Sequence, residues 1–236
     1  MLEKNVNGNT MDVAVLFSGG KDSTMAVYAA LRNGDDVRYL LSMKSKNDES
    51  YMFHVPNIHI TDLLSQALDI PLITAVTEGI KEEELKDLEK EFANLKSLGI
   101  EAVYTGALYS TYQKSRIERL GRSVGLKIIS PYWHVDELEY MREIVSLGFE
   151  IVISGVAAWG LDETWLGRTI DDDVIDELIK LNEKYQVDIA FEGGEAETLA
   201  IDGPIFKKRI KILKYKKEWH LDSGVYIIED AVLEDK

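Results

Sequence analysis

The sequence predicts an α/β protein, with a doubly wound parallel sheet followed by a smaller C-terminal α+β lobe. Short apolar runs alternate with longer amphipathic stretches through the first 130 residues, a pattern typical of right-handed βαβ units around a buried parallel sheet. The alternation continues beyond Pro131, and the C-terminal part changes to two β-type runs around Asp222-Ser223-Gly224. With 236 residues, 45% of them hydrophobic, the chain can build a large domain and a second lobe.

The first domain is expected to contain five strands with helices between them. The predicted strands cover residues 13–17, 37–43, 72–76, 102–105 and 127–130. The predicted helices cover residues 22–32, 58–68, 81–98 and 110–124. Asn33-Gly34, Pro71 and Gly99 follow three of these helices and favour their termination. We expect the strand order 3-2-1-4-5, a doubly wound arrangement in which ligands bind where the strand order reverses.

The C-terminal lobe is expected to mix helices and strands. Helices are predicted at residues 135–147 and 171–185, strands at 149–154 and 187–191, and an antiparallel pair at 205–213 and 225–232. These boundaries divide the chain into a flexible polar tail at residues 1–10, a main domain at 11–130 and a smaller lobe at 131–236.

Composition narrows the classes of function. The chain has no cysteine, which excludes disulfides, thiolate metal sites and cysteine nucleophiles from it. Its formal net charge of −15 argues against a broad nucleic-acid surface and suits a basic protein partner or a small substrate. No apolar run is long enough to span a membrane, and MLEKNVNGNT lacks the apolar core of a signal peptide. We therefore expect a cytoplasmic protein that binds neither nucleic acid nor membrane.

A glycine-containing loop, SGGKDS at Ser18–Ser23, follows the first predicted strand and precedes the first helix. Gly19 and Gly20 allow a tight turn with N–H groups close to an anion, and the helix directs its positive end to the same place. Lys21 adds a charge, Ser18 and Ser23 add hydroxyl donors, and Asp22 fits the first helical turn. The sequence therefore predicts a phosphate-binding loop rather than an ordinary glycine-rich turn.

This loop differs from the other common phosphate-binding patterns. A Walker A loop needs a glycine five residues before the glycine of Gly-Lys, and serine or threonine directly after the lysine. Val15 and Asp22 do not meet that pattern, and the loop contains no GxGxxG. After an apolar strand, SGGKDS instead resembles the loop of the PP-loop ATP pyrophosphatases, which cleave ATP between the α and β phosphates.

Four further segments make the resemblance more specific. They read TGALYSTYQKSRIE from Thr105, SPYW from Ser130, LDETWLGR from Leu161 and FEGGEAETLAIDGPIF from Phe191. Together with SGGKDS they look like the diphthine–ammonia ligase family, in a compact form similar to the archaeal members. The resemblance runs from Met11 to about Ile228. It implies the PP-loop, adenine nucleotide α-hydrolase-like fold, with nucleotide binding in residues 11–130 and acceptor binding in residues 131–236.

The resemblance also implies a reaction. ATP, accompanied by Mg²⁺, would adenylate the diphthine carboxylate on translation elongation factor 2, and ammonia would displace AMP to form diphthamide. The composition fits, because without a glutaminase cysteine the nitrogen must come from free ammonia or from another protein. No protein ligand for a metal is assigned, and the sequence leaves open whether the chain forms a homo-oligomer. Two alternatives remain: another AMP-forming PP-loop ligase acting on a small carboxylate, and a non-catalytic nucleotide sensor of the universal-stress type.

Individual residues follow from the matched motifs, except Met43 and His54, which follow from the end of the second predicted strand and the loop after it. The nucleotide-binding residues are expected to be Ser18, Gly19, Gly20, Lys21, Asp22, Ser23, Met43, His54 and Gly106. The acceptor-binding residues are expected to be Tyr112, Gln113, Arg116, Glu118, Trp165, Arg168, Gly193, Gly194 and Thr198. Lys21, Glu192, Glu195 and Glu197 are the catalytic candidates, since three carboxylates within six residues could bind a cation or ammonium, or take a proton from the attacking nitrogen.

Alternative structural roles remain open at several of these positions. Arg116 could neutralise phosphate or carboxylate charge, or pair with a neighbouring glutamate on an exposed helix. Met43 could equally be a core methionine. Trp165 is suited to the quaternary ammonium of diphthine, with Trp133 and Trp159 as further candidates, although tryptophan more often packs in a core. Ala196 stands where the family would lead us to expect an aromatic residue.

Overall fold

The computed structural model describes residues 10–46, 56–80 and 83–236, which form two compact units. Unit 1 contains residues 10–18, 22–46, 70–80 and 83–133. Unit 2 contains Gly19–Lys21, residues 56–69 and His134–Lys236. Residues 1–9 of the predicted tail lie outside the described residues, and so does His54.

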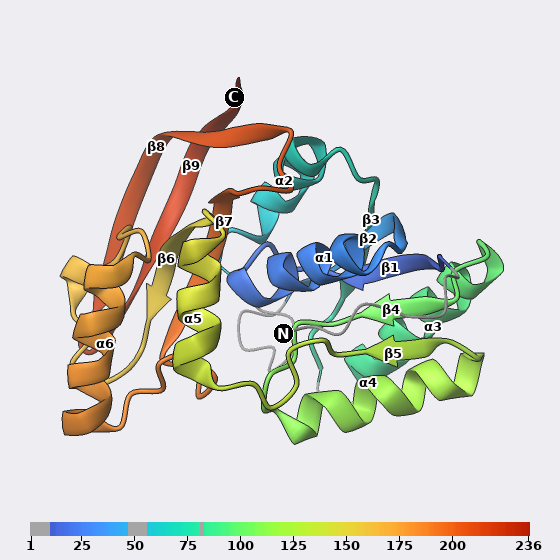
Figure 1. Ribbon diagram of the computed structural model, residues 1–236, viewed down its shortest axis with the longest axis horizontal. Coiled ribbons are helices and arrows are strands. Elements are labelled where there is room, and N and C mark those ends of the chain that lie inside the picture. Colours follow the sequence, from blue (N-terminus) through green and yellow to red (C-terminus); the bar gives the residue numbers. More distant parts are fainter. Residues whose placement is uncertain (1–9, 47–55, 81–82) are drawn as a thin grey trace. The chain divides into compact units, whose positions relative to one another are not determined.

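Unit 1 is built on a parallel sheet of five strands (Figure 1). The strands are β1 (Asp12–Leu16), β2 (Asp36–Ser45), β3 (Leu72–Thr77), β4 (Ala102–Tyr104) and β5 (Lys127–Ile129). Their order is β3-β2-β1-β4-β5, and every neighbouring pair is parallel. The structure therefore confirms the predicted fold class and strand order, and places the reversal of order between β1 and β4.

Helices cover the sheet of unit 1. They are α1 (Lys21–Asn33), α3 (Glu83–Ser97) and α4 (Thr111–Val124). The apolar residues of α3 recur at helical spacing and are fully or almost fully buried: Leu85, Leu88, Phe92 and Leu95. They pack with α4 and with Ala14, Leu41 and Val103 of the sheet in one core cluster. Burial of this stripe is the main reason that the charged α3 sequence folds as a helix.

A polar network is buried where α1 leads into β2. The Tyr104 hydroxyl donates to Asp35 Oδ2 at 2.6 Å, and Asn33 Nδ2 donates to the same oxygen at 3.0 Å. The Met11 N–H donates to Asp35 Oδ1 at 3.2 Å. Burial, followed by the bond to Asp35 and its negative charge, raises the pKa of Tyr104 above its ordinary value. The network ties the α1–β2 connection to β4.

Unit 2 contains an antiparallel sheet of four strands. They are β6 (Glu150–Val156), β7 (Ala196–Asp202), β8 (Lys208–His220) and β9 (Ser223–Asp235), in the order β7-β6-β9-β8. The predicted C-terminal pair is confirmed and is longer than expected. Ser223 already pairs with His220, so the connecting turn is centred on Leu221 and Asp222 rather than on Asp222-Ser223-Gly224.

One predicted strand in unit 2 is wrong. Residues 187–191 form no strand, and the strand in this region, β7, begins only at Ala196. Asp188 Oδ1 accepts the Ala190 N–H at 2.8 Å, and the Phe191 N–H donates to the Asp188 carbonyl at 3.1 Å. These local bonds replace a sheet ladder with a turn, as aspartate side chains often do.

Helices and two short 3-10 turns, η1 (Ile58–Ile60) and η2 (Glu163–Trp165), complete unit 2. Helices α5 (Glu137–Ser146) and α6 (Asp172–Tyr185) begin after the capping residues Asp136 and Asp171, whose carboxylates each accept a backbone N–H at 2.9 Å. Helix α2 (Thr61–Leu68) also belongs to this unit. Asn57, just before it, donates its amide to Tyr226 O and accepts the Ile228 N–H, both at 2.8 Å, and so holds the segment against β9.

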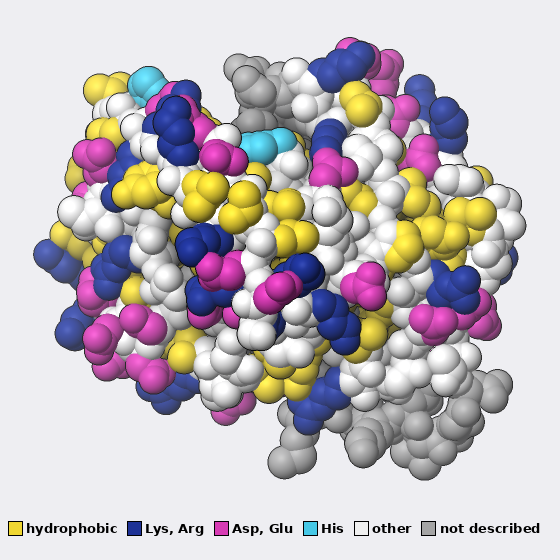
Figure 2. Space-filling view, turned by 90° about the horizontal axis from the view of Figure 1, so that it is seen from above, with side chains coloured by type: hydrophobic (Ala, Val, Ile, Leu, Met, Phe, Trp, Pro, Cys, Tyr) yellow, Lys and Arg dark blue, Asp and Glu magenta, His cyan; other side chains and the backbone are white. Residues whose placement is uncertain are grey.

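The charges on β8 are largely matched within its own hairpin. Lys208, Lys211 and Lys214 of β8 pair with Asp235, Glu234 and Glu229 of β9, at 2.8, 2.6 and 2.7 Å respectively. Basic and acidic side chains are also interspersed over the face shown in Figure 2. Within the described residues, no helix is both long and apolar enough to cross a membrane.

Candidate functional site

The SGGKDS loop joins β1 to α1, as the sequence predicts. Its two serines meet in unit 1: the Ser18 N–H donates to Ser23 Oγ at 3.3 Å, and the two hydroxyl oxygens also lie 3.3 Å apart. Helix α1 begins at Lys21, so Asp22 and Ser23 occupy its first turn. The loop therefore places two hydroxyls and the positive end of a helix together, an arrangement suited to a phosphate group.

The middle of the loop is held by β7 within unit 2. The Ala200 N–H donates to the Gly19 carbonyl at 2.9 Å, and the Lys21 N–H donates to Thr198 Oγ1 at 3.1 Å. Gly19 has a positive φ of 86°, and a Cβ added to it would lie 2.6 Å from Leu64 Cδ1. Only glycine fits this backbone conformation and this close approach. Thr198, predicted to bind the acceptor, thus shapes the loop through its hydroxyl.

The loop after β4 lies against the start of α1 within unit 1. A Cβ added to Gly106 would lie 2.5 Å from the carbonyl carbon and 2.6 Å from the carbonyl oxygen of Asp22. Thr105 Oγ1 and Ser130 Oγ, after β4 and β5, are hydrogen bonded at 2.9 Å. SGGKDS and the loop after β4 therefore lie together, and Gly106 is needed because the two backbones almost touch.

Helix α4 carries four predicted acceptor residues, two of which, Tyr112 and Arg116, contact each other. The Arg116 guanidinium carbon lies 3.4 Å from the centre of the Tyr112 ring, and its Nη1 donates to Tyr112 O at 3.4 Å. Glu118 pairs with Lys114 at 3.6 Å. The Gln113 N–H donates to the Ser110 hydroxyl, the cap of α4. The structure thus stacks Arg116 on Tyr112.

Glu195 is held by hydrogen bonds at its side chain and at its backbone. Its Oε1 accepts the Asp188 N–H at 3.2 Å, and its backbone carbonyl accepts the Ala157 N–H at 2.8 Å. The carboxylate folds over Gly193, where an added Cβ would lie 2.5 Å from Oε1. Gly194 follows with a positive φ of 86°. The two glycines therefore let the chain turn tightly beneath the Glu195 side chain.

The two other candidate carboxylates flank Glu195. Glu192 lies in the turn before β7 and is half-buried. Glu197 lies on β7 itself and is exposed. Glu197 lies opposite Gly155 of β6. Ala196, where an aromatic residue was expected, is buried and pairs with Val156. The candidate carboxylates thus extend from a turn into the first residues of a strand.

Two further acidic residues, which the sequence analysis did not select, lie beside Glu195. The Glu137 carboxyl at the start of α5 is hydrogen bonded to the Asp188 carboxyl. Burial raises the pKa of Glu137, and the negative charges of Asp188, Asp136 and Glu195 raise it further. Glu137 and Asp188 are about fifty residues apart in the chain, so no local motif joins them.

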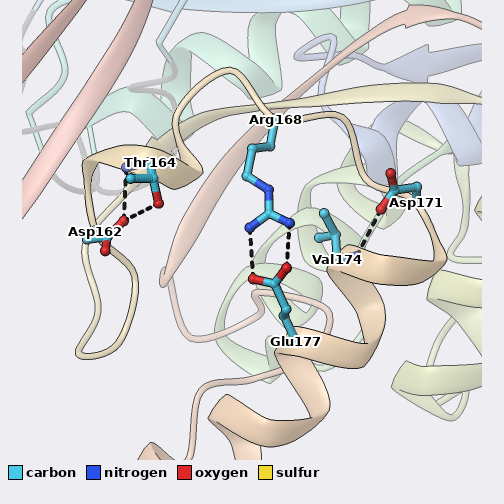
Figure 3. A network of polar contacts seen from close by, with 6 residues as sticks. All are labelled: Asp162, Thr164, Arg168, Asp171, Val174 and Glu177. Atoms are coloured by element: carbon cyan, nitrogen blue, oxygen red, sulfur yellow. Dashed lines mark hydrogen bonds and ion pairs between the residues drawn. The ribbon is translucent and has the colours of Figure 1, made fainter.

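Figure 3 shows how Arg168 is held in unit 2. It forms two parallel bonds to Glu177 of α6, with Nη1–Oε2 at 2.9 Å and Nη2–Oε1 at 2.8 Å. Its guanidinium carbon also lies 4.6 Å from the centre of the Trp165 ring. Trp165 itself is 5% exposed. One face of this ring therefore already carries a cation, and both residues have a packing role that competes with the predicted role at the acceptor.

The two other candidate tryptophans differ from Trp165. Lys114 Nζ lies 4.0 Å from the centre of the Trp133 ring. Trp159 is 83% exposed, in a tight turn closed by the Leu161 N–H and the Ala158 carbonyl at 3.1 Å. Gly160 in this turn has a positive φ of 94°, and a Cβ there would lie 2.7 Å from Tyr185 Cδ2. The turn is thus fixed to α6 while it presents the indole to solvent.

The remaining nucleotide candidates are Met43 and His54. Met43 is buried in the core cluster beside α3, so the structure supports the core alternative for it. His54 falls outside the described residues. Within residues 10–46, 56–80 and 83–236, no three histidine or acidic side chains converge as a metal-binding group. The phosphate loop fits a triphosphate. Its glycines allow a close approach of the backbone, and its paired serines supply hydroxyl donors.

Comparisons with known proteins match two consecutive parts of the chain to one family. Residues 11–128 match the family model for the diphthamide synthase N-terminal domain, and residues 136–233 match that for the diphthamide synthase C-terminal domain. The chain is 31% identical to the diphthine–ammonia ligase of Rattus norvegicus, over 86% of this chain and 83% of the relative. It is also 31% identical to the diphthine–ammonia ligase of Homo sapiens, over 85% of this chain and 82% of the relative. It is 30% identical to that of Schizosaccharomyces pombe over 96% of this chain but only 40% of that longer relative.

Proposed function

Because the chain belongs to the diphthamide synthase family, we propose that it is an AMP-forming ligase that amidates diphthine with ammonia and ATP. The observation that carries this proposal is the joint match of both halves of the chain to the family, with SGGKDS at the start of α1. The acceptor we propose is diphthine on translation elongation factor 2. Mg²⁺ accompanies the ATP phosphates as the counter-charge.

The first step is transfer of AMP to the acceptor. A carboxylate oxygen of diphthine attacks the α-phosphorus, the bond to the bridging oxygen of the β-phosphate breaks, and pyrophosphate leaves. Lys21, the two loop serines and the first turn of α1 stabilise the departing charge, because preorganised donors act most strongly on charge that develops during reaction. Asp22 and Gly106 keep that turn and the loop after β4 in register.

The second step forms the amide. The ammonia nitrogen attacks the acyl carbon, the bond to the AMP oxygen breaks, and the nitrogen loses a proton to a base. Glu192, Glu195 and Glu197 supply the negative charge that binds ammonium and accepts protons. Glu195 is suited to this role because its Oε1 and its backbone carbonyl are both held by hydrogen bonds.

The acceptor requires charge and an aromatic surface. A quaternary ammonium has no N–H to donate and is bound by carboxylates and by ring faces. Of the three candidate tryptophans, Trp159 offers an exposed indole in a turn that follows Ala157, whose N–H is bonded to Glu195 O. Tyr112 with Arg116 is the second proposed acceptor element, since a stacked guanidinium can still bind a carboxylate through its edge.

The decisive experiment combines a cellular and a purified assay. Elongation factor 2 from a strain lacking this protein should carry diphthine instead of diphthamide by mass spectrometry. Purified protein should release AMP and pyrophosphate only with ATP, ammonium and diphthine-modified elongation factor 2 together. A different AMP-forming ligase would leave elongation factor 2 fully amidated in the deletion strain, and a nucleotide sensor would bind ATP without releasing pyrophosphate.

A further inference from the structure

We propose that Glu137 and Asp188 form a carboxyl pair that positions Glu195 for its work on ammonia. This inference rests on the proposed function and adds two residues that the motifs do not include. Both are positioning residues, since they act through Glu195 and not on the reacting atoms. The argument concerns unit 2 alone, where Glu137 begins α5, Asp188 follows α6 and Glu195 precedes β7.

The Glu195 carboxylate depends on the Asp188 backbone for its orientation. Oε1 accepts the Asp188 N–H at 3.2 Å, while Oε2 is buried and has no hydrogen-bond partner among the described residues. Gly193 lies directly beneath, with room for no Cβ. Because Oε1 is fixed by a single donor, a shift of Asp188 would turn the carboxylate and move Oε2 with it.

Asp188 is in turn held from two sides. Its Oδ1 accepts the Ala190 N–H at 2.8 Å, and its carbonyl accepts the Phe191 N–H at 3.1 Å, which closes a tight turn. Its carboxyl group is also bonded to Glu137. Helix α5 is capped by Asp136, so the Glu137 side chain extends from a fixed helix terminus. Glu137 thus connects a rigid helix to the turn that orients Glu195.

A hydrogen bond between two carboxyl groups requires a proton. Burial of Glu137 and the negative charges of Asp188, Asp136 and Glu195 raise its pKa, and these are the acidic groups that face it. The raised pKa of Glu137 favours the protonated form, which can donate to the Asp188 carboxylate. Ionisation of both carboxyls would replace an attraction by repulsion at contact distance, and the Asp188 turn would move away from α5.

The test is the ammonium dependence of AMP formation by the full chain, measured with ATP and diphthine-modified elongation factor 2. Glu137→Ala should raise the KM for ammonium roughly tenfold, with the KM for ATP unchanged. Glu137→Gln should stay within about twofold of wild type, because its amide can donate to Asp188 as the neutral acid does. Glu139→Ala, on the same first turn of α5 and exposed, is the matched control and should behave as wild type.

A pH series separates positioning from simple folding. As pH rises through the raised pKa of Glu137, the KM for ammonium should increase in wild type relative to Glu137→Gln, which cannot ionise. The ratio of the two proteins cancels the titration of ammonia itself. If Glu137→Ala folds poorly, Asp188→Asn is the second variant, because its side-chain oxygen can still accept the Ala190 N–H. We expect Asp188→Asn to keep the wild-type KM for ammonium near neutral pH.

Four results would overturn the inference. An unchanged KM for ammonium in Glu137→Ala, in an active preparation, contradicts positioning while the proposed function stands. Equal damage by glutamine and alanine, or equal changes in the KM values for ATP and ammonium, assigns Glu137 a purely structural role. A wild-type protein that forms no AMP with ammonium and the modified acceptor would reject the proposed function and this inference together.

Discussion

At the scale of single residues, Lys21 is the side chain that gives the phosphate loop its positive charge. The neighbouring donors are hydroxyls and backbone groups, which are weaker partners for a departing pyrophosphate than an ammonium is. The Lys21 backbone is fixed independently of its side chain, because its N–H is bonded to Thr198. Removal of the side chain charge should therefore leave the loop in place.

Lys21→Ala is expected to lower the rate of AMP formation by roughly a hundredfold or more. The measurement is the steady-state release of AMP and pyrophosphate, with thermal unfolding recorded alongside. Lys211→Ala is the matched control, since it removes the same charge from an exposed ion pair with Glu234 and should leave turnover unchanged. Near-normal turnover in Lys21→Ala would reject the assignment of SGGKDS to phosphate.

The tryptophans give a second prediction at this scale. Trp159→Leu should raise the acceptor KM from several-fold up to roughly thirtyfold, since cation–π contacts contribute about 0.5–2 kcal/mol. The melting temperature should not change, because the indole is 83% exposed. Trp165→Leu should instead lower the free energy of unfolding by about 2 kcal/mol, because it leaves a void beneath Arg168.

Titration of elongation factor 2 and thermal unfolding of both variants provide the comparison. A specific rise in acceptor KM with Trp165→Leu, at unchanged stability, would return Trp165 to the acceptor role predicted from its motif. A stable Trp159→Leu protein with a wild-type acceptor KM would remove the exposed turn from acceptor binding.

At the scale of secondary-structure elements, the contact between the loop after β4 and the start of α1 determines the geometry of the phosphate loop. Gly106→Ala would bring a Cβ to 2.5 Å from the Asp22 backbone, which cannot move aside as a side chain can. We expect a loss of about 1–3 kcal/mol in stability and a clear increase in the KM for ATP. The control is Ala107→Gly in the same loop, which tests for loop flexibility alone. Gly99→Ala would not serve, because alanine would be strained at the positive φ of Gly99.

The KM for ATP and the melting temperature of these two variants measure the effect. If Gly106→Ala binds ATP as wild type does, the two backbones are not as close as the structure has them. If Ala107→Gly raises the KM for ATP as much as Gly106→Ala does, flexibility of the loop and not steric conflict is responsible.

The Asp35–Tyr104 network makes a prediction for alkaline pH. The folded protein raises the pKa of Tyr104, so the hydroxyl stabilises the fold fully below the ordinary tyrosine pKa of about 10. That contribution is lost as pH rises above about 10 toward the folded-state value. Tyr104→Phe should therefore be less stable than wild type by roughly 1–2 kcal/mol at pH 7, with the difference shrinking above pH 10.

Urea unfolding of both proteins between pH 7 and pH 11 gives this difference directly, and groups other than Tyr104 cancel between them. A stability difference that is independent of pH would show that folding does not raise the pKa of Tyr104, because the difference shrinks only if the unfolded chain loses this proton at a lower pH than the folded protein.

Most of these elements could be predicted from sequence periodicity, and the exceptions have local causes. The parallel strands are short apolar runs, and the order of the sheet follows from the doubly wound pattern. Residues 187–191 look like a strand because Val187, Ala190 and Phe191 are apolar and buried, yet Asp188 turns the chain there. β7 was missed because EGGEAET reads as a polar loop, although alternate residues of it are buried.

The candidate site could be predicted only in part for a related reason. SGGKDS and EGGE are contiguous motifs, so their residues can be found by reading the chain. Glu137 and Asp188 become neighbours only when α5 and the turn after α6 come together. The cation on the Trp165 ring is similarly invisible in LDETWLGR, because Arg168 reaches it through a turn and is held there by Glu177 on another element.

At the scale of the whole molecule, the absence of cysteine limits the nitrogen source. We expect ammonium to support AMP formation by the purified chain and glutamine not to replace it. The rate at fixed total ammonium should rise with pH near neutrality, because only NH₃ carries a free lone pair. The rise should flatten where a carboxylate such as Glu195 deprotonates bound ammonium.

The assay compares ammonium chloride with ammonia-free glutamine across pH 6–9. Robust glutamine-dependent turnover by this chain alone would contradict the prediction. A rate that is flat across the whole range would assign deprotonation to the protein and not to the solvent.

The hydrogen bonds that join Gly19 to Ala200 and Lys21 to Thr198 also have a consequence for the synthesis of the chain on the ribosome. All five strands of the parallel sheet have left the ribosome once residue 129 is exposed, whereas the partners of the loop are made some seventy residues later. The segment that leads into helix α2 is restrained later still, because Asn57 is hydrogen bonded to residues 226 and 228. A nascent chain can therefore assemble its nucleotide sheet early, but its phosphate loop receives its final restraints only when synthesis is nearly finished.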